Sequence, residues 1–231
     1  MILKVMPERL ILENMVPSAA LQAILDSHWL PEIAQKINDK LAAEAALREK
    51  FFDEVTESQK AEFIDGEVVV HSPAKDRHIE ISDWLLRLLG ERVDRIGGKL
   101  RHEKALCVFT RNSYEPDIVY FGVEKSLKID GDTLKYPVPD FIVEILSEST
   151  EKIDRGVKFE DYAAHGVKEY WIVDPRDQTL EQYLLGDEGG FKLKLKSSSG
   201  EVKSEVLGGL TIPIAAIFDA GAFRAAMDGM K

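Results

Sequence analysis

The chain has 231 residues, 45% of them hydrophobic and 31% charged, which is typical of a soluble globular protein. Its net charge of -11 excludes a module that binds nucleic acid through overall charge, because such modules are basic. Any nucleic-acid contact has to be local, or to depend on cations bound in an acidic site. The sequence has no apolar run of the roughly 18 residues that a membrane span needs, and its start lacks a signal-peptide layout. We therefore expect a cytoplasmic protein without membrane contact.

The single cysteine, Cys107, excludes an intramolecular disulfide and a metal site built from several cysteines. Its neighbours in ALCVF are apolar, and no obvious base flanks it. The pattern predicts a thiol buried in a strand rather than a nucleophile.

Residues 1–50 differ from the remainder of the chain. The stretch 17–50 is rich in Ala, Leu, Glu and Lys, with apolar residues at helical spacing. Pro31 predicts a break between two helices, because proline removes a backbone donor and clashes with the preceding turn. We expect an N-terminal helical extension over 1–50 that serves as a lid or as the arm of a homodimer, followed by one domain over 51–231.

Short strands and one long helix follow. FIDGEVVVHSP at 63–73 predicts a hairpin, because Asp-Gly between apolar segments favours a tight turn. Residues 78–96 predict a helix that stops at Gly97 and Gly98. We expect its apolar stripe to consist of Ile79, Trp84, Leu85, Leu88, Leu89 and Val93. Residues 105–123 predict two strands joined by a polar turn, and residues 124–138 a charged loop.

The C-terminal half alternates strands with a helix. VPDFIVEIL at 138–146 and VKEYWIVD at 167–174 predict strands, and TEKIDRGVKFEDYAAHG between them predicts one helix that ends at Gly166. This order predicts a parallel pair with a right-handed crossover. TLEQYLLG and GFKLKLKSS predict an antiparallel pair, and a short helix closes the chain. The fold class is α/β or α+β, with a mixed sheet flanked by helices.

Glu144 stands out because it lies in the middle of the apolar run FIVEIL. Alternate residues of a strand share a face, so Ile142, Glu144 and Leu146 point one way, and Phe141, Val143 and Ile145 the other. Burying a carboxylate there costs several kcal/mol unless a cation, a metal or strong hydrogen bonds compensate it. The sequence therefore predicts a compensating group.

EPDIVYF at 115–121 repeats the Pro-Asp strand entry of the Glu144 segment. If these strands are neighbours, Asp117 and Glu144 converge, and Asp140 lies on the Glu144 side of its strand. Two carboxylates with waters and substrate phosphates suit Mg²⁺ or Mn²⁺. A salt bridge from Glu144 to a buried lysine or arginine is the alternative.

Four further side chains are candidates for chemistry. Lys158 lies on the helix after the Glu144 strand, with Tyr162 one turn later on the same face. This lysine could hold a phosphate or an attacking water, although helix lysines are more often solvated. Glu80, with His78 beside it, could supply another acid or donor, although a glutamate at a helix start is ordinarily explained by the helix dipole.

The chain contains, in order, EFIDGEVVVHSP followed by His78, EPDIVYF, VPDFIVEILSEST and DRGVKFEDYAAHGVKEYWIVDP. With this series of motifs it closely resembles the Uma-two family of predicted bacterial endonucleases. That family belongs to the PD-(D/E)XK superfamily, also called restriction-endonuclease-like. The resemblance runs from about Glu62 to Phe218. It leaves the long helical extension before Phe51 unexplained.

The resemblance implies a mixed sheet flanked by helices, with metal ligands on two adjacent strands. By position, Asp117 looks like the superfamily's aspartate and Glu144 like its second acid. The superfamily usually has a lysine two residues after that acid, where this chain has Leu146. Lys158 resembles the lysine of the following helix that is thought to replace it, and Glu80 matches an extra metal-binding glutamate more loosely.

Two hypotheses for function follow. The first is a Mg²⁺- or Mn²⁺-dependent phosphodiesterase acting on DNA, with Asp117 and Glu144 holding the ion and Lys158 orienting water or stabilising charge. The second is a nuclease-like fold kept as a binding or assembly module without turnover. The net charge, Leu146 and the extra N-terminal helices, which could dimerise, favour it. A nucleotide-binding protein is discounted because no glycine-rich phosphate loop joins a strand to a helix.

Overall fold

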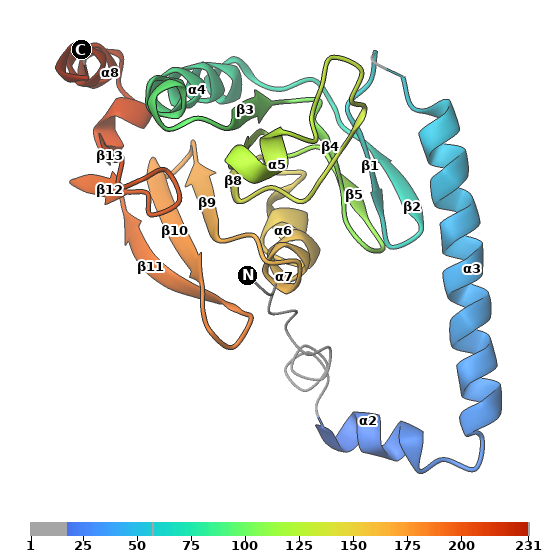
Figure 1. Cartoon of the computed structure of the whole chain (residues 1–231). Coiled ribbons are helices and arrows are strands. Elements are labelled where there is room, and N and C mark those ends of the chain that lie inside the picture. The colour runs from blue at the N-terminus through green and yellow to red at the C-terminus, as the bar shows by residue number, and fades with distance from the viewer. Residues whose placement is uncertain (1–17, 57, 231) are drawn as a thin grey trace.

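The computed structural model describes residues 18–56 and 58–230, and a six-stranded mixed sheet lies at its centre (Figure 1). The strands lie in the order β11-β10-β9-β8-β6-β3. The pair β8 and β9 is parallel, and the other neighbours are antiparallel. The bounds are β3 (Lys99–His102), β6 (Ile118–Phe121), β8 (Phe141–Ile145), β9 (Glu169–Asp174), β10 (Thr179–Leu185) and β11 (Phe191–Ser197). The predicted parallel pair, β8 and β9, and the antiparallel pair, β10 and β11, are both confirmed.

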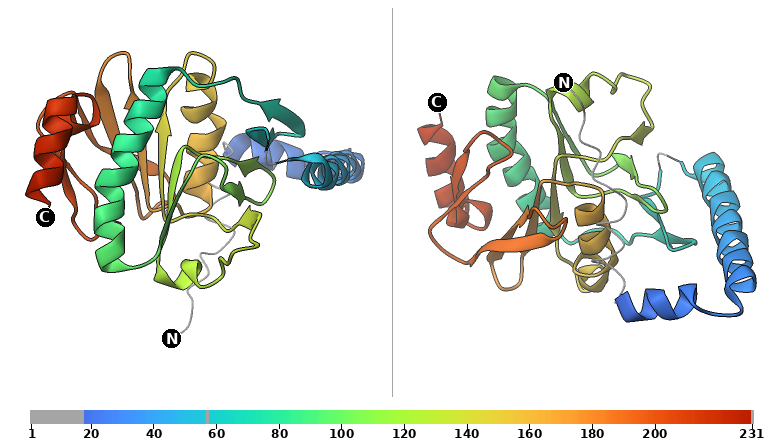
Figure 2. Two further views of the ribbon diagram at one scale, coloured as in Figure 1. Left: turned by 90° about the horizontal axis from the view of Figure 1, so that it is seen from above. Right: turned by 60° about the horizontal axis from the view of Figure 1, so that its bottom comes forward.

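Helices cover both faces of this sheet, as Figure 2 shows from above. The helix α4 (Asp76–Ile96) and the C-terminal helix α8 (Ala220–Gly229) lie on one face, and α7 (Val157–Ala164) lies on the other. Phe141, Val143 and Ile145 of β8 join the core on the α4 side. Ile142 packs with Tyr162 on the opposite side. The alternation predicted for β8 is therefore confirmed, and it directs Glu144 towards α7.

A second sheet, in the order β2-β1-β5-β4-β7, stands beside the first. The strands β1 (Ala61–Ile64) and β2 (Glu67–Val70) form the predicted hairpin. Asp65 and Gly66 both have positive φ at its turn, as a two-residue turn of this kind requires. The remaining strands are β4 (Leu106–Val108), β5 (Ser113–Tyr114) and β7 (Lys135–Tyr136).

The crossover between β8 and β9 is broken, whereas the sequence predicted one continuous helix. It consists of α6 (Glu151–Asp154) and α7, separated at Gly156. The backbone there has φ -111° and ψ -107°, which is not helical. A Cβ at Gly156 would come within 2.6 Å of the carbonyl oxygen of Lys152, so this turn depends on glycine.

Three other predictions need correction. Residues 105–123 form three strands instead of two, because Pro116 cannot donate to a ladder and the chain passes there from β5 in one sheet to β6 in the other. The expected loop 124–138 contains most of α5 (Val123–Ser126) and the short strand β7. Ile79 is 54% exposed, and Ile81 takes its place in the core, because two residues turn a helix by about 200°.

The C-terminal segment closes the α4 side of the sheet. It contains β12 (Glu201–Lys203), β13 (Thr211–Pro213) and a 3₁₀ turn over Ile214–Ile217 before the predicted final helix, α8. Cys107 is buried, as predicted, and burial raises the pKa of its thiol well above the usual range. Among the described residues, we find no helix with the length and apolar character needed to cross a membrane.

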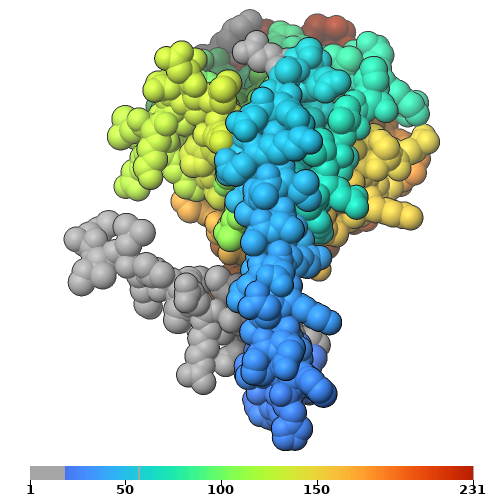
Figure 3. All heavy atoms as spheres, turned by 90° about the vertical axis from the view of Figure 1, so that its right-hand side faces the viewer, coloured from blue at the N-terminus to red at the C-terminus, as the bar shows by residue number. Residues whose placement is uncertain are grey.

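The N-terminal extension forms a projecting arm (Figures 1 and 3). It consists of α2 (Ser18–Leu25) and α3 (Leu30–Glu54), and Pro31 lies in the first turn of α3, at the predicted break. Because α3 continues to Glu54, the boundary expected at residue 50 falls inside a helix. Glu44 pairs with Arg111 at 2.6 Å, and Phe51 packs in a small core with Phe63. The remainder of α3 extends beyond the body.

Candidate active site

The structure brings Asp117 and Glu144 together on neighbouring antiparallel strands. Ile118 of β6 pairs with Val143 of β8, so the next position along the register places Asp117 opposite Glu144. Side chains of directly opposed residues project from the same face of a sheet, with Cβ atoms about 5 Å apart. Both carboxylates are buried. The predicted convergence of these two acids is therefore present.

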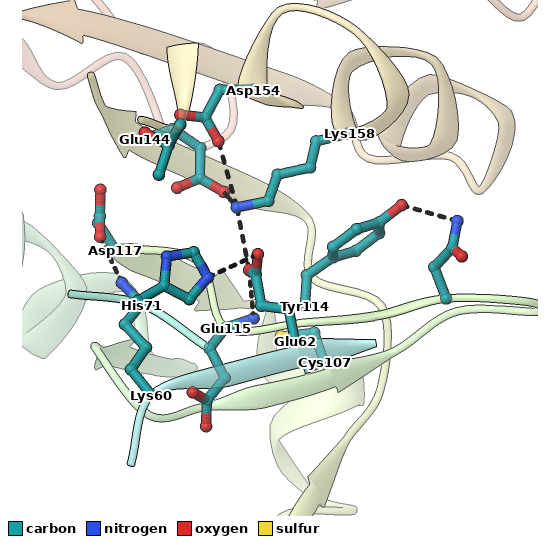
Figure 4. Close-up of polar contacts among 12 residues, drawn as sticks. Lys60, Glu62, His71, Cys107, Tyr114, Glu115, Asp117, Glu144, Asp154 and Lys158 are labelled. Atoms are coloured by element: carbon teal, nitrogen blue, oxygen red, sulfur yellow. Dashed lines mark hydrogen bonds and ion pairs between the residues drawn. The ribbon is translucent and has the colours of Figure 1, made fainter. Parts of the chain in front are cut away.

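Glu144 belongs to a buried cluster around the ammonium group of Lys158, shown in Figure 4. The Lys158 Nζ atom lies 3.0 Å from Glu144 Oε1, 3.0 Å from Glu62 Oε1 and 3.2 Å from Asp154 Oδ1. Tyr162 donates a hydrogen bond to the same Glu144 oxygen at 2.8 Å. The Lys158 side chain is only 2% exposed. Lysine therefore supplies the compensation that the sequence required for Glu144, in the form of the predicted salt-bridge alternative.

The ionisable groups of this cluster differ in the direction in which their pKa values are shifted. Burial raises the pKa of Glu144 to about 8, although Lys158 favours its charged form. Burial also opposes ionisation of Glu62, but Lys158 and His71 outweigh it and lower the pKa of Glu62 to about 2. Burial alone would lower the pKa of Lys158, yet the neighbouring carboxylates raise it well above its usual range. The lysine therefore stays charged, and Glu144 accepts a proton far more readily than Glu62.

Asp117 has a separate set of partners at the more open end of the site. Its Oδ1 atom lies 2.7 Å from Lys60 Nζ and 3.4 Å from His78 Nε2. Its Oδ2 atom accepts a hydrogen bond from the backbone N–H of Ile145 at 2.8 Å. Burial works against the carboxylate, but Lys60 and His78 hold the pKa of Asp117 well below its usual range. Asp117 is therefore a carboxylate at any ordinary pH.

Three side chains at this open end could share one metal ion. Ligand atoms of His78, Glu103 and Asp117 lie within 4.8 Å of one another. Carboxylate oxygens with an imidazole nitrogen form a donor set that suits Mn²⁺, and carboxylates with water suit Mg²⁺. Glu103 has a φ of 60°, a conformation that non-glycine residues seldom adopt and that occurs often at functional sites. The residues present therefore fit a divalent cation.

Of the other predicted site residues, two lie in these clusters and two lie elsewhere. His78 joins Asp117, and Tyr162 joins Glu144. Asp140 lies at the opposite end of β8 from Glu144, where it contacts Gly122 N, Lys125 Nζ and Lys168 Nζ at 2.9, 3.1 and 2.9 Å. Glu80 is exposed on α4 and is not part of the three-residue group that could hold one ion. Neither Asp140 nor Glu80 is brought to the two clusters.

Sequence reasoning missed Lys60, Glu62, Glu103 and Asp154. Glu62 carries the same signal as Glu144, a carboxylate inside a strand that is otherwise apolar, AEFI. Asp154 stands four residues before Lys158, which is the spacing of a helical ion pair. No local signal marks Lys60 or Glu103, because both reach the site through the packing of the two sheets.

Relatives of this chain share the fold. A putative nuclease of the DUF820 group from Anabaena variabilis has a crystal structure that superimposes with a TM-score of 0.64, over 76% of this chain and 97% of that one, at 18% identity. This likeness confirms the predicted restriction-endonuclease-like fold. Two Synechocystis proteins, slr1290 and sll1609, are 26% and 28% identical over 158 and 150 residues. These regions cover 67% and 63% of this chain, and 82% and 84% of the relatives.

The family assignment rests on most of the domain that carries the site. The model of the Uma2 family, described as "Putative restriction endonuclease", matches residues 48–215. That range contains both clusters and the six strands of the central sheet. The chain therefore belongs to the Uma2 family of restriction-endonuclease-like proteins.

Proposed function

We propose that the protein is a Mg²⁺- or Mn²⁺-dependent nuclease that hydrolyses phosphodiester bonds in DNA at the Asp117–Glu144 pair. The observation that carries this proposal is the convergence of two buried carboxylates from adjacent strands, with a histidine and a third carboxylate at the open end. Membership of the Uma2 family supports the same reaction class. With a net charge of -11, the contact with DNA is local to the site. We place the protein in the cytoplasm.

Each residue has a distinct proposed role. Asp117 is the principal ligand, with His78 and Glu103 completing the open side and Glu144 facing the ion from β8. A bound ion would polarise the scissile phosphate and lower the pKa of the attacking water. The Lys158 ammonium group lies 3.0 to 3.2 Å from oxygens of three carboxylates. Lys158 therefore acts by positioning Glu144 and not by contacting water or phosphate.

The direct test is DNA cleavage by the purified chain. We expect supercoiled plasmid or single-stranded DNA to be cut with millimolar Mn²⁺ and to remain intact with a chelator. Asp117→Asn keeps an oxygen for the Ile145 N–H but removes the charge that a cation needs, so it should be inactive. Cleavage that continues in the chelator, or that Asp117→Asn performs at the wild-type rate, would contradict the proposal.

The N-terminal arm favours a second candidate function, that of an assembly module. A homodimer formed through the arm is compatible with both the nuclease and the assembly module. One face of α3 carries an apolar stripe in its first half, made of Leu30, Ile33, Ile37 and Leu41. Near the end of the helix, the same face directs Phe51 into the body. Ile37 is 49% and Leu41 47% exposed, so the described residues cover this half of the face only in part. Antiparallel pairing about Ile37 would place Ile33 opposite Leu41 of the second copy. This self-matching apolar stripe makes a second copy the proposed partner.

If the dimer forms, replacing residues of the apolar stripe with glutamate should lower the molecular mass of the particle in solution. Ile37→Glu together with Leu41→Glu should convert a dimer into a monomer, because the pairing would bury four new carboxylates. Ala46→Glu, on a different and exposed face of α3, should leave the dimer intact. Light scattering after gel filtration measures both. A wild-type chain that remains monomeric at tens of micromolar would rule out this arm-mediated dimer.

A further inference from the structure

Lys60 occupies the place where the proposed metal would neutralise charge. Its Nζ atom lies 2.7 Å from Asp117 Oδ1 and 3.7 Å from Glu103 Oε2. These are two of the three side chains whose ligand atoms lie close enough to hold one ion. Oδ1 is also the Asp117 oxygen that His78 approaches at 3.4 Å. The ammonium group of Lys60 therefore shares its partners with a cation in this site.

An ammonium group and a metal ion cannot occupy that position together. Metal–oxygen bonds to Mg²⁺ or Mn²⁺ are about 2.1 Å long, so an ion on Asp117 Oδ1 would come far closer than the lysine does. Two cations at such separations repel one another strongly in a partly buried site. An ion that binds Asp117 has to displace Lys60 first.

The position of Lys60 allows that displacement. It precedes β1 and its side chain is 21% exposed, whereas Lys158 is 2% exposed and enclosed by three carboxylates. A long, flexible lysine at the edge of the site has a path into solvent once an ion takes over its carboxylate partners. Lys158 has no such path, so the two lysines have different functions.

We propose that Lys60 is a built-in competitor of the metal: it neutralises Asp117 and Glu103 in the ion-free protein and leaves when an ion binds. This inference rests on the proposed metal-dependent function and adds a residue that sets the affinity of the site. The exchange keeps Asp117 paired with a cation in both states, so the buried carboxylate is never left uncompensated. The cost is a weaker apparent affinity for the ion.

Calorimetric titration with Mn²⁺ tests the competition directly. Lys60→Met should bind Mn²⁺ at least about tenfold more tightly than wild type, because no ammonium group has to be displaced. Lys60→Arg, which retains the competing charge, should stay close to wild type. Lys75→Met removes an exposed lysine that pairs with Glu148 at 3.2 Å and controls for the loss of one positive charge. Its affinity should match that of wild type.

A second measurement uses the wild-type chain and does not depend on any variant folding. Brief treatment with acetic anhydride, followed by mass spectrometry, reports how accessible each lysine amine is. Mg²⁺ should increase the modification of Lys60 severalfold and leave that of Lys75 unchanged. The ion-paired ammonium group is protected, and the displaced one is free to react.

The outcomes separate this inference from the proposed function. If wild type binds Mn²⁺, but Lys60→Met binds no more tightly and Mg²⁺ does not change the labelling of Lys60, the competitor role is wrong and the metal site stands. If neither chain binds Mn²⁺, both the competitor role and the metal-dependent nuclease are wrong. Tighter binding by Lys60→Met, with increased labelling in wild type, supports the competitor.

Discussion

Glu144→Gln should lower the Mn²⁺-dependent cleavage of DNA by at least about 100-fold, because glutamine cannot ionise, whereas a bound ion would favour the charged form of Glu144 and use it as a ligand. The fold should survive. Glutamine retains an oxygen that can accept from Tyr162, which donates to Glu144 at 2.8 Å. It also resembles the protonated acid, and burial already raises the pKa of Glu144 to about 8. Initial rates on plasmid DNA, compared at equal Mn²⁺ occupancy, measure the loss.

A matched substitution separates catalysis from structure. Glu169 is another buried carboxylate in the same sheet, which accepts hydrogen bonds from Trp171 and Gln182. Glu169→Gln should reduce stability without a comparable effect on the cleavage rate of the folded fraction. Cleavage by Glu144→Gln at the wild-type rate would remove Glu144 from the active site and leave it as the partner of Lys158.

Lys158→Met should reduce the free energy of unfolding by about 3–5 kcal/mol at neutral pH, because it leaves buried carboxylates without their cation. Three of these lie within 3.2 Å of the Lys158 ammonium group. Lys168→Met, whose side chain is 65% exposed, removes a surface ion pair to Asp140 and should cost about 1 kcal/mol or less. Urea unfolding of both variants gives the comparison.

The loss from Lys158→Met should grow as pH rises. In wild type, the pKa of Glu62 is lowered from 4.5 to about 2, so its contribution to stability is present above pH 4.5 and disappears as pH falls through 2. Without Lys158, only His71 opposes the effect of burial on Glu62, and burial should raise the pKa of Glu144 further. A carboxyl group whose folded-state pKa is raised costs stability as pH rises above its unfolded value, so the loss continues to higher pH in the variant. Between pH 5 and pH 8, the free energy of unfolding should therefore decrease more for Lys158→Met than for wild type.

A partial rescue gives this prediction a further check. Adding Asp154→Asn to Lys158→Met removes one of the uncompensated charges, and should recover part of the stability at pH 8 but little at pH 5. Equal losses at the two pH values, or no recovery in the double variant, would show that Lys158 stabilises the fold by packing alone.

Much of the site was predictable because it depends on local rules. Strand periodicity placed Glu144 on the same face of β8 as Ile142, and the repeated Pro-Asp entry pointed to Asp117 on the neighbouring strand. Helical spacing placed Tyr162 beside Lys158. These are properties of single strands and helices, which a sequence states directly.

The missing parts depend on how distant segments pack. Lys60 and Glu62 reach the site only because the β1–β2 sheet stands beside the central one, and no periodicity reports that arrangement. The break at Gly156 was also missed, because a lone glycine inside a helical pattern is usually tolerated. Pattern reasoning left a metal and a buried lysine or arginine open as the group that offsets Glu144, and in the folded chain Lys158 contacts it.

The hydrogen bond from the Ile145 N–H to Asp117 has a consequence for how this fold can evolve. The Asp117 carboxylate accepts this hydrogen bond at 2.8 Å, in place of a backbone carbonyl, at the edge where β6 and β8 separate. A related chain without nuclease activity would still need an acceptor there to keep its two strands in place. Selection for folding alone would then preserve Asp117. Its presence in a related chain is evidence of an intact sheet, whereas the companions Glu103 and His78 would be the better markers of retained chemistry.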